Sequence, residues 1–535
     1  MVVSMKFVRI LDCTLRDGGY CNQWDFGETN IHKIIDGLTE AGIDIIECGF
    51  VSNKVHSDKN RSKFASIEDV SSVIPANRSG SIYVAMINYG EYDIDKIPPH
   101  SKGLIDGIRI AFHKRNIEPA LEFCHILKKK GYMVFIQAMV SMAYSDQEFL
   151  NLIEKVNRIK PYAFYIVDSF GMMKKRDLTR FFSLCENNLD KDIFIGFHSH
   201  NNLQLAYSNT LALIDMRSGR DLIIDSTVYG MGRGAGNLNT ELFIDHMNSD
   251  YAFNYDLKPI LTIMDEVING FYQQNPWGYS LPNYLSAVHN AHPNYAGFLS
   301  DKSTMTIDMM DDVFARMDSV KKFEYDKDYV ERLYSDYMSA NNAREAHMED
   351  FKKILSGKVV LLIGPGKSSE IYKESIREFS SHDNVITISV NFSYSHCKTD
   401  FIFVSNNIRY KEISEGEKSK CIITSNIPDD AVYLQIKYKD LLNDNEFVKD
   451  NSGLMASKLM TLFDVKSLYL AGFDGYSYDT SDNYVEGPRV LMTKKAIMDA
   501  TNQGMSEVFG KLSKHIDLHF LTKPVYFQIS SDQFQ

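Results

Sequence analysis

The sequence has few cysteines, and none of them are spaced as a metal or redox pair. Seven cysteines are dispersed over 535 residues without a Cys-x-x-Cys motif, which is the pattern of reduced thiols in a cytosolic protein. The N-terminus lacks the charged-then-apolar layout of a secretion signal. No run approaches the roughly 20 apolar residues that span a bilayer. We therefore expect a cytoplasmic protein with no membrane partner.

An excess of basic residues is also missing. The 58 lysines and arginines are outnumbered by 70 acidic residues, so the formal net charge is −12. This balance argues against nucleic acid as a partner, because a phosphate backbone requires a basic surface. The content of 44% hydrophobic and 24% charged residues is typical of a soluble protein. The length predicts two or three domains rather than one core.

Short apolar runs alternate with amphipathic stretches throughout the first half of the chain. Each run is rich in β-branched or aromatic residues, as expected of a strand buried on both faces. There are eight such runs, at residues 7–15, 43–50, 81–88, 104–112, 132–140, 163–170, 193–200 and 221–228. Eight alternating strands and helices predict an α/β fold, a (β/α)₈ TIM barrel over residues 6–250. A doubly wound open sheet is the alternative.

The remainder of the chain divides into two further regions. Residues 251–346 carry helical patterns and no clear strand, and predict a helical extension. Residues 356–535 alternate strands and helices again, with apolar runs at 358–364, 384–390, 401–406, 420–426, 431–438, 467–473 and 516–521. This pattern predicts a second α/β domain of the Rossmann-like type.

Polar side chains follow the first and seventh predicted strands, where a (β/α)₈ barrel places its chemistry. Arg16 and Asp17 precede two glycines after the first strand, and His198 and His200 end the seventh. Residues i and i+2 of a strand point to the same side, so both imidazoles can reach one ion. Two imidazoles and a carboxylate can bind a metal ion on one side and leave its other coordination positions open for substrate and water. The alternative is that the two histidines are an ordinary surface pair and that Arg16 and Asp17 form a structural ion pair.

A glycine-rich loop follows the eighth predicted strand. Glycine occupies positions 230, 232, 234 and 236, and Asn237 comes next. Glycines permit unusual backbone angles and close backbone approach. The position directly after a strand favours a substrate or metal loop over a flexible surface loop, and we single out Gly232, Gly234 and Gly236 as the substrate loop.

Three motifs in this order resemble the metal-dependent aldolase, lyase and synthase superfamily. They are DCTLRDGG at 12–19, HSHNN at 198–202 and STVYGMGRGAGN at 226–237. The superfamily includes 4-hydroxy-2-oxovalerate aldolase, hydroxymethylglutaryl-CoA lyase and isopropylmalate synthase, and the resemblance extends from residue 6 to about 300. It implies a divalent metal ion (Mn²⁺, Mg²⁺, Co²⁺ or Zn²⁺) bound by Asp17, His198 and His200. Asn237 matches an asparagine that lies at the metal in some members.

The resemblance also implies a reaction. It predicts a lyase that makes or breaks a carbon–carbon bond beside a 2-oxo acid such as pyruvate, through a metal-stabilised enolate. Arg16 matches the residue that stabilises the enolate oxygen. Glu47 falls where several members keep a glutamate near the substrate, although an ion pair is an equal interpretation. The second reactant is an aldehyde or an acyl-CoA, and the helical extension suggests a homodimer.

The sequence departs from this family where a base is expected. The aldolases carry a histidine shortly after the Arg-Asp pair, and here Tyr20 lies in that neighbourhood. A tyrosine with a pKa near 10 is a poor base at neutral pH but can donate a proton. His113, after the fourth strand, is another candidate proton carrier. An acyl-CoA-dependent Claisen synthase and a non-catalytic binding barrel remain alternative functions.

The second domain begins with a strand, a glycine turn and a helix start. Such a turn can present backbone N–H groups to a phosphate, and Gly364, Gly366, Lys367 and Ser368 are the candidate nucleotide-binding residues. The turn fits neither standard motif, because Leu361 replaces a Walker A glycine and Ser369 replaces the third glycine of a dinucleotide fingerprint. A purely structural domain is the competing interpretation.

Overall fold

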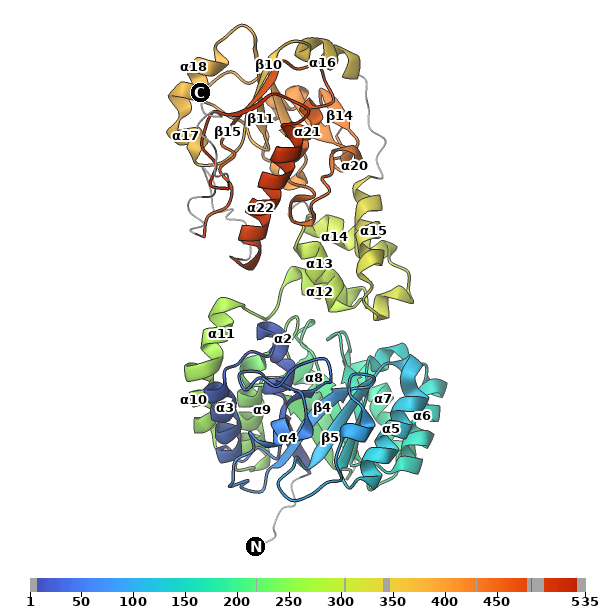
Figure 1. The fold of residues 1–535 in the computed structure, drawn as a ribbon. Helices are drawn as coiled ribbons and strands as arrows, with labels where there is room; N and C mark the ends of the chain where they lie inside the picture. Colours follow the sequence, from blue (N-terminus) through green and yellow to red (C-terminus); the bar gives the residue numbers. More distant parts are fainter. Residues whose placement is uncertain are drawn as a thin grey trace. The chain divides into compact units, whose positions relative to one another are not determined.

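The computed structural model describes residues 7–217, 219–302, 305–339, 347–429, 431–478, 483 and 495–526. These residues fall into two compact units (Figure 1). The first contains residues 1–297 and 317–325, and the second contains residues 298–316 and 326–535. Each unit is built around its own parallel sheet.

The first sheet closes into a barrel of eight parallel strands, which confirms all eight predicted runs and excludes an open sheet. The strands run in the order β1-β9-β8-β7-β6-β5-β4-β2, and β1 pairs with β2 to close the ring. A two-residue strand, β3 (Lys63–Phe64), pairs with β2 outside the ring. The barrel strands are β1 (Val8–Asp12), β2 (Ile45–Val51), β4 (Ile82–Asn88), β5 (Gly107–Phe112), β6 (Met133–Ala138), β7 (Ala163–Asp168), β8 (Phe194–Ser199) and β9 (Leu222–Ser226).

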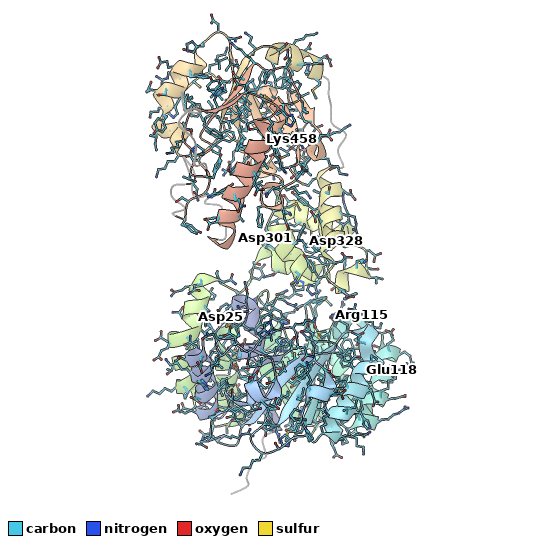
Figure 2. The ribbon with its side chains drawn as sticks, viewed as in Figure 1. Asp25, Arg115, Glu118, Asp301, Asp328 and Lys458 are labelled. Carbon is cyan, nitrogen blue, oxygen red and sulfur yellow. The ribbon has the colours of Figure 1, made fainter. Side chains whose placement is uncertain are left out.

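The barrel strands are buried on both faces, because each is rich in β-branched and aromatic residues and is covered by a helix on the outside. Every residue of β2, β5, β7 and β9 is buried. The outer helices turn apolar stripes inward and charged residues outward, as Figure 2 shows for Glu118. They are α3 (Glu28–Glu40), α4 (Ile67–Ser71), α5 (Ile117–Lys129), α6 (Asp146–Ile159), α7 (Lys175–Asn188), α8 (Ala206–Met216) and α9 (Thr240–Tyr251).

The segment after the barrel is helical, and the structure describes no strand in it. Its helices are α10 (Leu257–Ile263), α11 (Asn269–Gln274), α12 (Leu281–Val288), α13 (Pro293–Ser300), α14 (Ile307–Arg316) and α15 (Lys327–Met338). The segment contributes residues to both compact units. The predicted domain limits at 6, 346 and 535 lie outside the described residues, so the boundaries stay predictions.

The second sheet has seven parallel strands and confirms all seven predicted runs of this half. Its order is β14-β13-β12-β11-β10-β15-β16. The strand order therefore reverses at β10, which lies between β11 and β15. The strands are β10 (Val359–Ile363), β11 (Val385–Val390), β12 (Phe401–Val404), β13 (Cys421–Thr424), β14 (Leu434–Ile436), β15 (Ser467–Ala471) and β16 (Leu518–Phe520). The Rossmann-like character of this unit stays a prediction.

Candidate active site

A cavity of about 290 Å³ opens where the barrel strands end. Its lining comes from the residues that end or follow seven of the eight barrel strands and from the glycine loop after the eighth, which is where a barrel of this kind presents its reactive groups. Four predicted site residues besides the histidine pair line it, namely Arg16, Asp17, Tyr20 and His113. Polar groups that we did not predict also line it, among them Gln137, Arg233 and His292.

The structure brings Asp17, His198 and His200 together as predicted. Asp17 ends α1 (Thr14–Asp17), a single helical turn that follows β1. His198 lies in β8, and His200 follows the strand end, so alternation along the strand turns both side chains to one side. The Nε2 atoms of His198 and His200 lie 3.9 and 3.7 Å from Asp17 Oδ2. All three side chains are buried, and their ligand atoms lie within 4.8 Å of one another.

The protonation states of this triangle suit a cation. Burial alone would raise the pKa of Asp17, but Arg16 and the two histidines lower it well below its usual range. Burial lowers the pKa of His200 to about 3. At neutral pH the site therefore offers an ionised carboxylate beside a neutral imidazole. These are the forms in which both groups bind metals.

A second buried layer holds His198 in place. Asp225, on β9, has its Oδ2 atom 3.0 Å from His198 Nδ1, which leaves Nε2 turned toward Asp17. Asp225 also forms an ion pair with Arg109, a fully buried side chain of β5. Arg109 Nη1 lies 2.9 Å from Glu47 Oε2 on β2. A carboxylate behind a ligating histidine fixes its tautomer and ring orientation.

The residues present fit a divalent cation on two observations. First, the buried group contains Arg16 and Arg109 against Asp17, Glu47 and Asp225. Two cations against three anions leave one net negative charge in a desolvated site, and such a charge is costly unless it is compensated. Second, Asn237 donates from Nδ2 to Asp17 Oδ2, while its buried Oδ1 has no hydrogen-bond partner among the described residues.

Two nitrogen atoms of the Arg16 guanidinium are hydrogen-bonded, and the third has no partner among the described residues. Its Nε donates to Glu47 Oε2 at 2.8 Å, and its Nη1 donates to Asp17 Oδ1 at 2.9 Å. Its Nη2 is buried and has no partner among the described residues, although Arg16 lines the cavity. An unpaired buried donor is rare in native proteins and calls for a ligand. Glu47 does not line the cavity, so its contacts are those of an ion pair that positions Arg16.

Tyr20 lies at the cavity as predicted. It belongs to α2 (Gly19–Asn22), and its ring packs edge-on against Trp24. The Arg233 guanidinium lies 5.4 Å from the centre of the Tyr20 ring. Burial raises the pKa of the Tyr20 phenol. Tyr20 is therefore a proton or hydrogen-bond donor at neutral pH and not a base.

Two histidines line the cavity away from the triangle. His113 follows β5, and burial lowers its pKa below 6.5, so the imidazole is neutral at pH 7. His292 is likewise neutral because burial lowers its pKa. Its Nδ1 accepts a hydrogen bond from the Asn294 N–H at 3.1 Å, so its proton is on Nε2. His292 can therefore donate but cannot accept at Nε2, whereas His113 makes no side-chain hydrogen bond in the described structure and can act as a base.

The glycine loop packs around the triangle rather than lining the cavity. A Cβ atom on Gly232 would lie 2.1 Å from Asn237 Nδ2, and one on Gly236 would lie 2.0 Å from the Gly230 carbonyl oxygen. Gly234 adopts φ +69°, a backbone conformation that favours glycine. The loop residue that reaches the cavity is Arg233, whose buried Nε has no described partner. The loop therefore packs against the candidate metal ligands and places the Arg233 guanidinium at the cavity.

The candidate nucleotide residues lie in the second unit, and the structure separates them. Gly364 and Gly366 line a cavity there, but Lys367 and Ser368 do not. Ser368 begins α17 (Ser368–Ile371), and its N–H donates to Asp474 Oδ2 at 2.7 Å. Its hydroxyl donates to the same carboxylate. The backbone donor that would bind a phosphate in a glycine turn is thus already used.

Three comparisons show which known proteins are similar to this chain. Residues 7–267 match the HMGL-like family model. A 4-hydroxy-2-oxovalerate aldolase of Pseudoalteromonas translucida is 27% identical over 273 residues, which cover 50% of this chain and 78% of that protein. An oxaloacetate decarboxylase of Mycobacterium tuberculosis is 27% identical over 44% of this chain and 68% of its own length. A crystal structure of the N-terminal domain of a candidate aldolase from Bacteroides vulgatus is 29% identical, with a TM-score of 0.47, and covers 54% of this chain and 95% of that one. Residues 7–267, which contain the barrel, are therefore similar to the HMGL-like family.

Sequence reasoning missed several groups at this site. Arg233 belongs to the glycine-rich motif at residues 226–237, but the sequence pattern does not show which residue of the loop points into the cavity. His292 lies in a segment whose packing against the site follows from the tertiary structure alone. Gln137 is the second-last residue of β6, so the rule that a barrel presents its reactive groups at strand ends could have found it. With its amide oriented to satisfy its neighbours, its oxygen accepts from Arg109 Nε at 3.2 Å.

Among the described residues, no helix combines the length and apolar character needed to cross a membrane.

Proposed function

We propose that the barrel is a divalent-metal-dependent lyase of the aldolase type that makes or breaks a carbon–carbon bond beside a 2-oxo acid. The single observation that carries the proposal is the buried triangle of Asp17, His198 and His200 beside the unpaired Nη2 of Arg16. A divalent cation bound by these three side chains would act as a Lewis acid toward the substrate oxygens. Two imidazole nitrogens suit Mn²⁺, Co²⁺ or Zn²⁺ better than Mg²⁺.

The chain's own residues supply the remaining chemistry. Arg16 donates from Nη2 to the oxygen on which negative charge develops, and Glu47 holds its guanidinium in that direction. Arg233 supplies positive charge for the substrate carboxylate. His113 accepts the proton of the reacting hydroxyl, because it is neutral and free to do so. Tyr20 and His292 donate hydrogen bonds that orient the second reactant.

The names of the relatives, rather than the geometry, support a proposal for the second reactant. The named relatives act on 4-hydroxy-2-oxovalerate and oxaloacetate. Both are 2-oxo acids, but aldol cleavage of the first releases an aldehyde, whereas decarboxylation of the second releases carbon dioxide. We favour an aldehyde as the second reactant because further relatives are also 4-hydroxy-2-oxovalerate aldolases. An acyl-CoA partner would make the protein a Claisen synthase. Release of free CoA thiol from a mixture of acyl-CoA and a 2-oxo acid would favour that alternative. A homodimer stays a prediction.

The proposal is tested by measuring metal content and the exchange of pyruvate methyl protons in deuterated water. We expect the wild type to retain a divalent metal and catalyse exchange. Asp17→Ala and His200→Ala should lose both, with a rate decrease of about a thousandfold or more. His246→Ala is the matched control, because His246 lies in α9 and pairs with Asp250 outside the cavity. Unchanged metal content in both site variants would contradict the assignment.

A further inference from the structure

The second unit contains a cavity at the point where its strand order reverses. The sheet runs outward from β10 in both directions, through β11 on one side and β15 on the other. A cavity of about 130 Å³ lies between the loops that follow these strands, with Gly364 and Gly366 after β10 and Gly472 after β15. In open parallel sheets, ligands bind outside the carboxyl ends of the strands at such a reversal.

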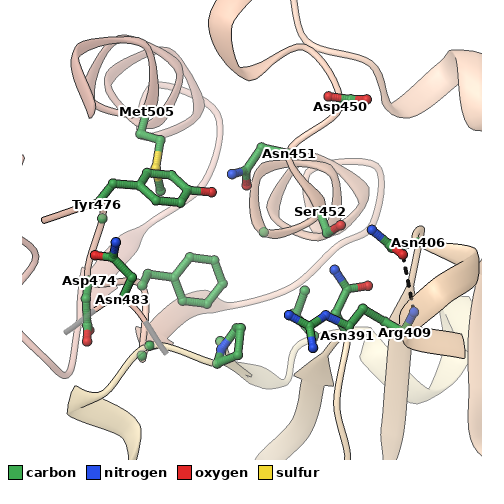
Figure 3. Close-up of a pocket in the computed structure, with 18 residues that line it drawn as sticks. Asn391, Asn406, Arg409, Asp450, Asn451, Ser452, Asp474, Tyr476, Asn483 and Met505 are labelled. Atoms are coloured by element: carbon green, nitrogen blue, oxygen red, sulfur yellow. Dashed lines mark hydrogen bonds between the residues drawn. The ribbon is translucent and has the colours of Figure 1, made fainter. Parts of the chain in front are cut away.

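One side of this cavity offers a positive charge and hydrogen-bond donors. Figure 3 shows Arg409 reaching toward Asn391, with Asn451 and Ser452 beside them. Arg409 belongs to α19 (Asn407–Tyr410), and its Nη1 lies 3.4 Å from Glu412. It is the one cationic side chain among the described residues that line the cavity. An arginine fork matches the geometry of a phosphate better than any other side chain.

A helix directs its N-terminus to the same side of the cavity. The nine-residue α21 (Ser452–Met460) begins there, and Ser452 and Gly453 both line the cavity. Asn451 caps the helix by accepting from the Leu454 N–H. First-turn N–H groups have no acceptor within their helix and carry partial positive charge. Together with Arg409 they form an anion-binding wall.

The opposite wall combines aromatic and apolar side chains with the polar Asp474 and Asn483. It contains Phe473, Tyr476 and Met505. In Figure 3 the Tyr476 ring lies across the cavity from Arg409, with its hydroxyl turned toward Asn451. An aromatic wall facing an anion-binding wall suits a ligand that has a flat ring at one end and a phosphate at the other.

The two carboxylates that line the cavity are already engaged. Asp450 accepts from the hydroxyls of Tyr334 at 2.9 Å and Tyr438 at 3.3 Å. Asp474 accepts from the backbone and the hydroxyl of Ser368. Because Asp474 occupies the glycine turn after β10, a phosphate cannot take the place that this turn would give it. The positive charge that lines the cavity lies instead on Arg409, beside the N-terminus of α21.

We propose that this cavity binds a nucleotide, with its phosphate at Arg409 and the N-terminus of α21 and its base or ribose against Phe473 and Tyr476. The inference is independent of the lyase proposed for the barrel. It moves the predicted nucleotide site from Lys367 and Ser368 to residues that follow β12 and begin α21.

The test is calorimetry on the full chain in EDTA, which removes divalent metal from the barrel and thereby separates the two proposals. The probes are AMP, GMP, CMP and UMP, their diphosphates, and inorganic phosphate. We expect at least one nucleotide to bind, and inorganic phosphate to bind far more weakly. Arg409→Gln should weaken that nucleotide roughly ten- to hundredfold, because a charge-assisted contact is lost.

Matched variants make the result interpretable. Arg377→Gln is the control, because Arg377 pairs with Glu374 at the same i,i+3 spacing but lies outside the cavity. Tyr476→Leu provides a second variant, which removes one of the two aromatic rings of the wall. It should weaken nucleotide binding while leaving phosphate binding unchanged. The proposal is overturned if no nucleotide binds, if inorganic phosphate binds equally well, or if folded Arg409→Gln and Tyr476→Leu both bind as tightly as the wild type.

Discussion

Both units place a cavity at the carboxyl ends of parallel strands, but the two cavities differ in how their charges are satisfied. In the barrel, charged and amide groups are buried together, and Arg16 Nη2 and Asn237 Oδ1 are left without described partners. In the second unit, Asp450 and Asp474 are both hydrogen-bonded within the protein. Buried groups left incomplete indicate a reactant or ion that completes them. A cavity whose carboxylates are already hydrogen-bonded indicates that a ligand is bound through weaker contacts. We therefore expect substitutions in the barrel to have the largest functional effects.

The largest effect in this comparison should come from His113. Replacing the base with His113→Gln should lower kcat/KM by about a hundred- to ten-thousandfold. The His113 pKa is lowered from 6.5, so the neutral, active form is lost only as the pH falls below 6.5. The wild-type profile of kcat/KM should show that acid limb and the variant should lack it. His100→Gln, an exposed histidine of the same barrel, is the control. A variant with wild-type activity would remove His113 from the mechanism.

The next effect should come from the spare donor of Arg16. Arg16→Lys keeps the charge but loses the fork that reaches Glu47, Asp17 and the substrate together. We expect kcat/KM to fall by about a hundred- to a thousandfold while bound metal is retained. Arg9→Lys is the control, because Arg9 lies in β1, shortly before Arg16 in the chain, and donates to the Tyr162 hydroxyl. Steady-state kinetics with parallel metal analysis checks this. Loss of the metal itself would assign Arg16 to metal binding instead.

A smaller effect should follow from loosening the layer behind His198. Asp225→Asn removes the carboxylate that His198 Nδ1 and Arg109 share. We expect metal affinity to fall by about ten- to a hundredfold, because the imidazole is less firmly oriented. Competition with a metal-binding dye, below the unfolding temperature, measures it. Asp245→Asn, exposed on α9, is the control. Equal affinities in the wild type and Asp225→Asn would leave Asp225 with a structural role only.

The smallest effect, and one confined to the second unit, should come from Asp474. Asp474→Ala leaves the Ser368 N–H and hydroxyl without their acceptor. We expect a loss of about 1–3 kcal/mol in the stability of this unit, and no change in lyase activity. Differential scanning calorimetry of the full chain, with exposed Asp444→Asn as control, checks the stability. A fall in lyase activity would show that the two units are functionally coupled, which would contradict the view that their cavities act separately.

Local patterns were sufficient for the strands and for the metal candidates. All fifteen predicted strands follow from the alternation of apolar runs with amphipathic stretches, because burial on both faces requires apolar side chains. The His198–His200 spacing places both rings on one side without knowledge of any partner. The region around Asp17 differs locally, since residues 14–17 form a helical turn rather than a continuous strand end. That turn still brings the carboxylate to the two imidazoles.

Long-range pairs were beyond the reach of these patterns. Arg109 and Asp225 meet across 116 positions of sequence, and Ser368 and Asp474 across 106. No periodicity records such pairs, since they depend on how the sheets close and which loops fold back. The same holds for His292, which reaches the barrel cavity from the helical segment.

By itself, the sequence determined two parallel α/β sheets, a barrel mouth carrying Asp17, His198 and His200, and a glycine turn after β10. These features rest on short-range periodicity, which the local chemistry of each strand enforces. The tertiary structure alone decided that Arg16 keeps one donor free, that Glu47 serves Arg16 rather than the cavity, and that Asp474 closes the glycine turn. Each of those outcomes depends on a partner distant in sequence, and only folding determines which buried polar group meets which.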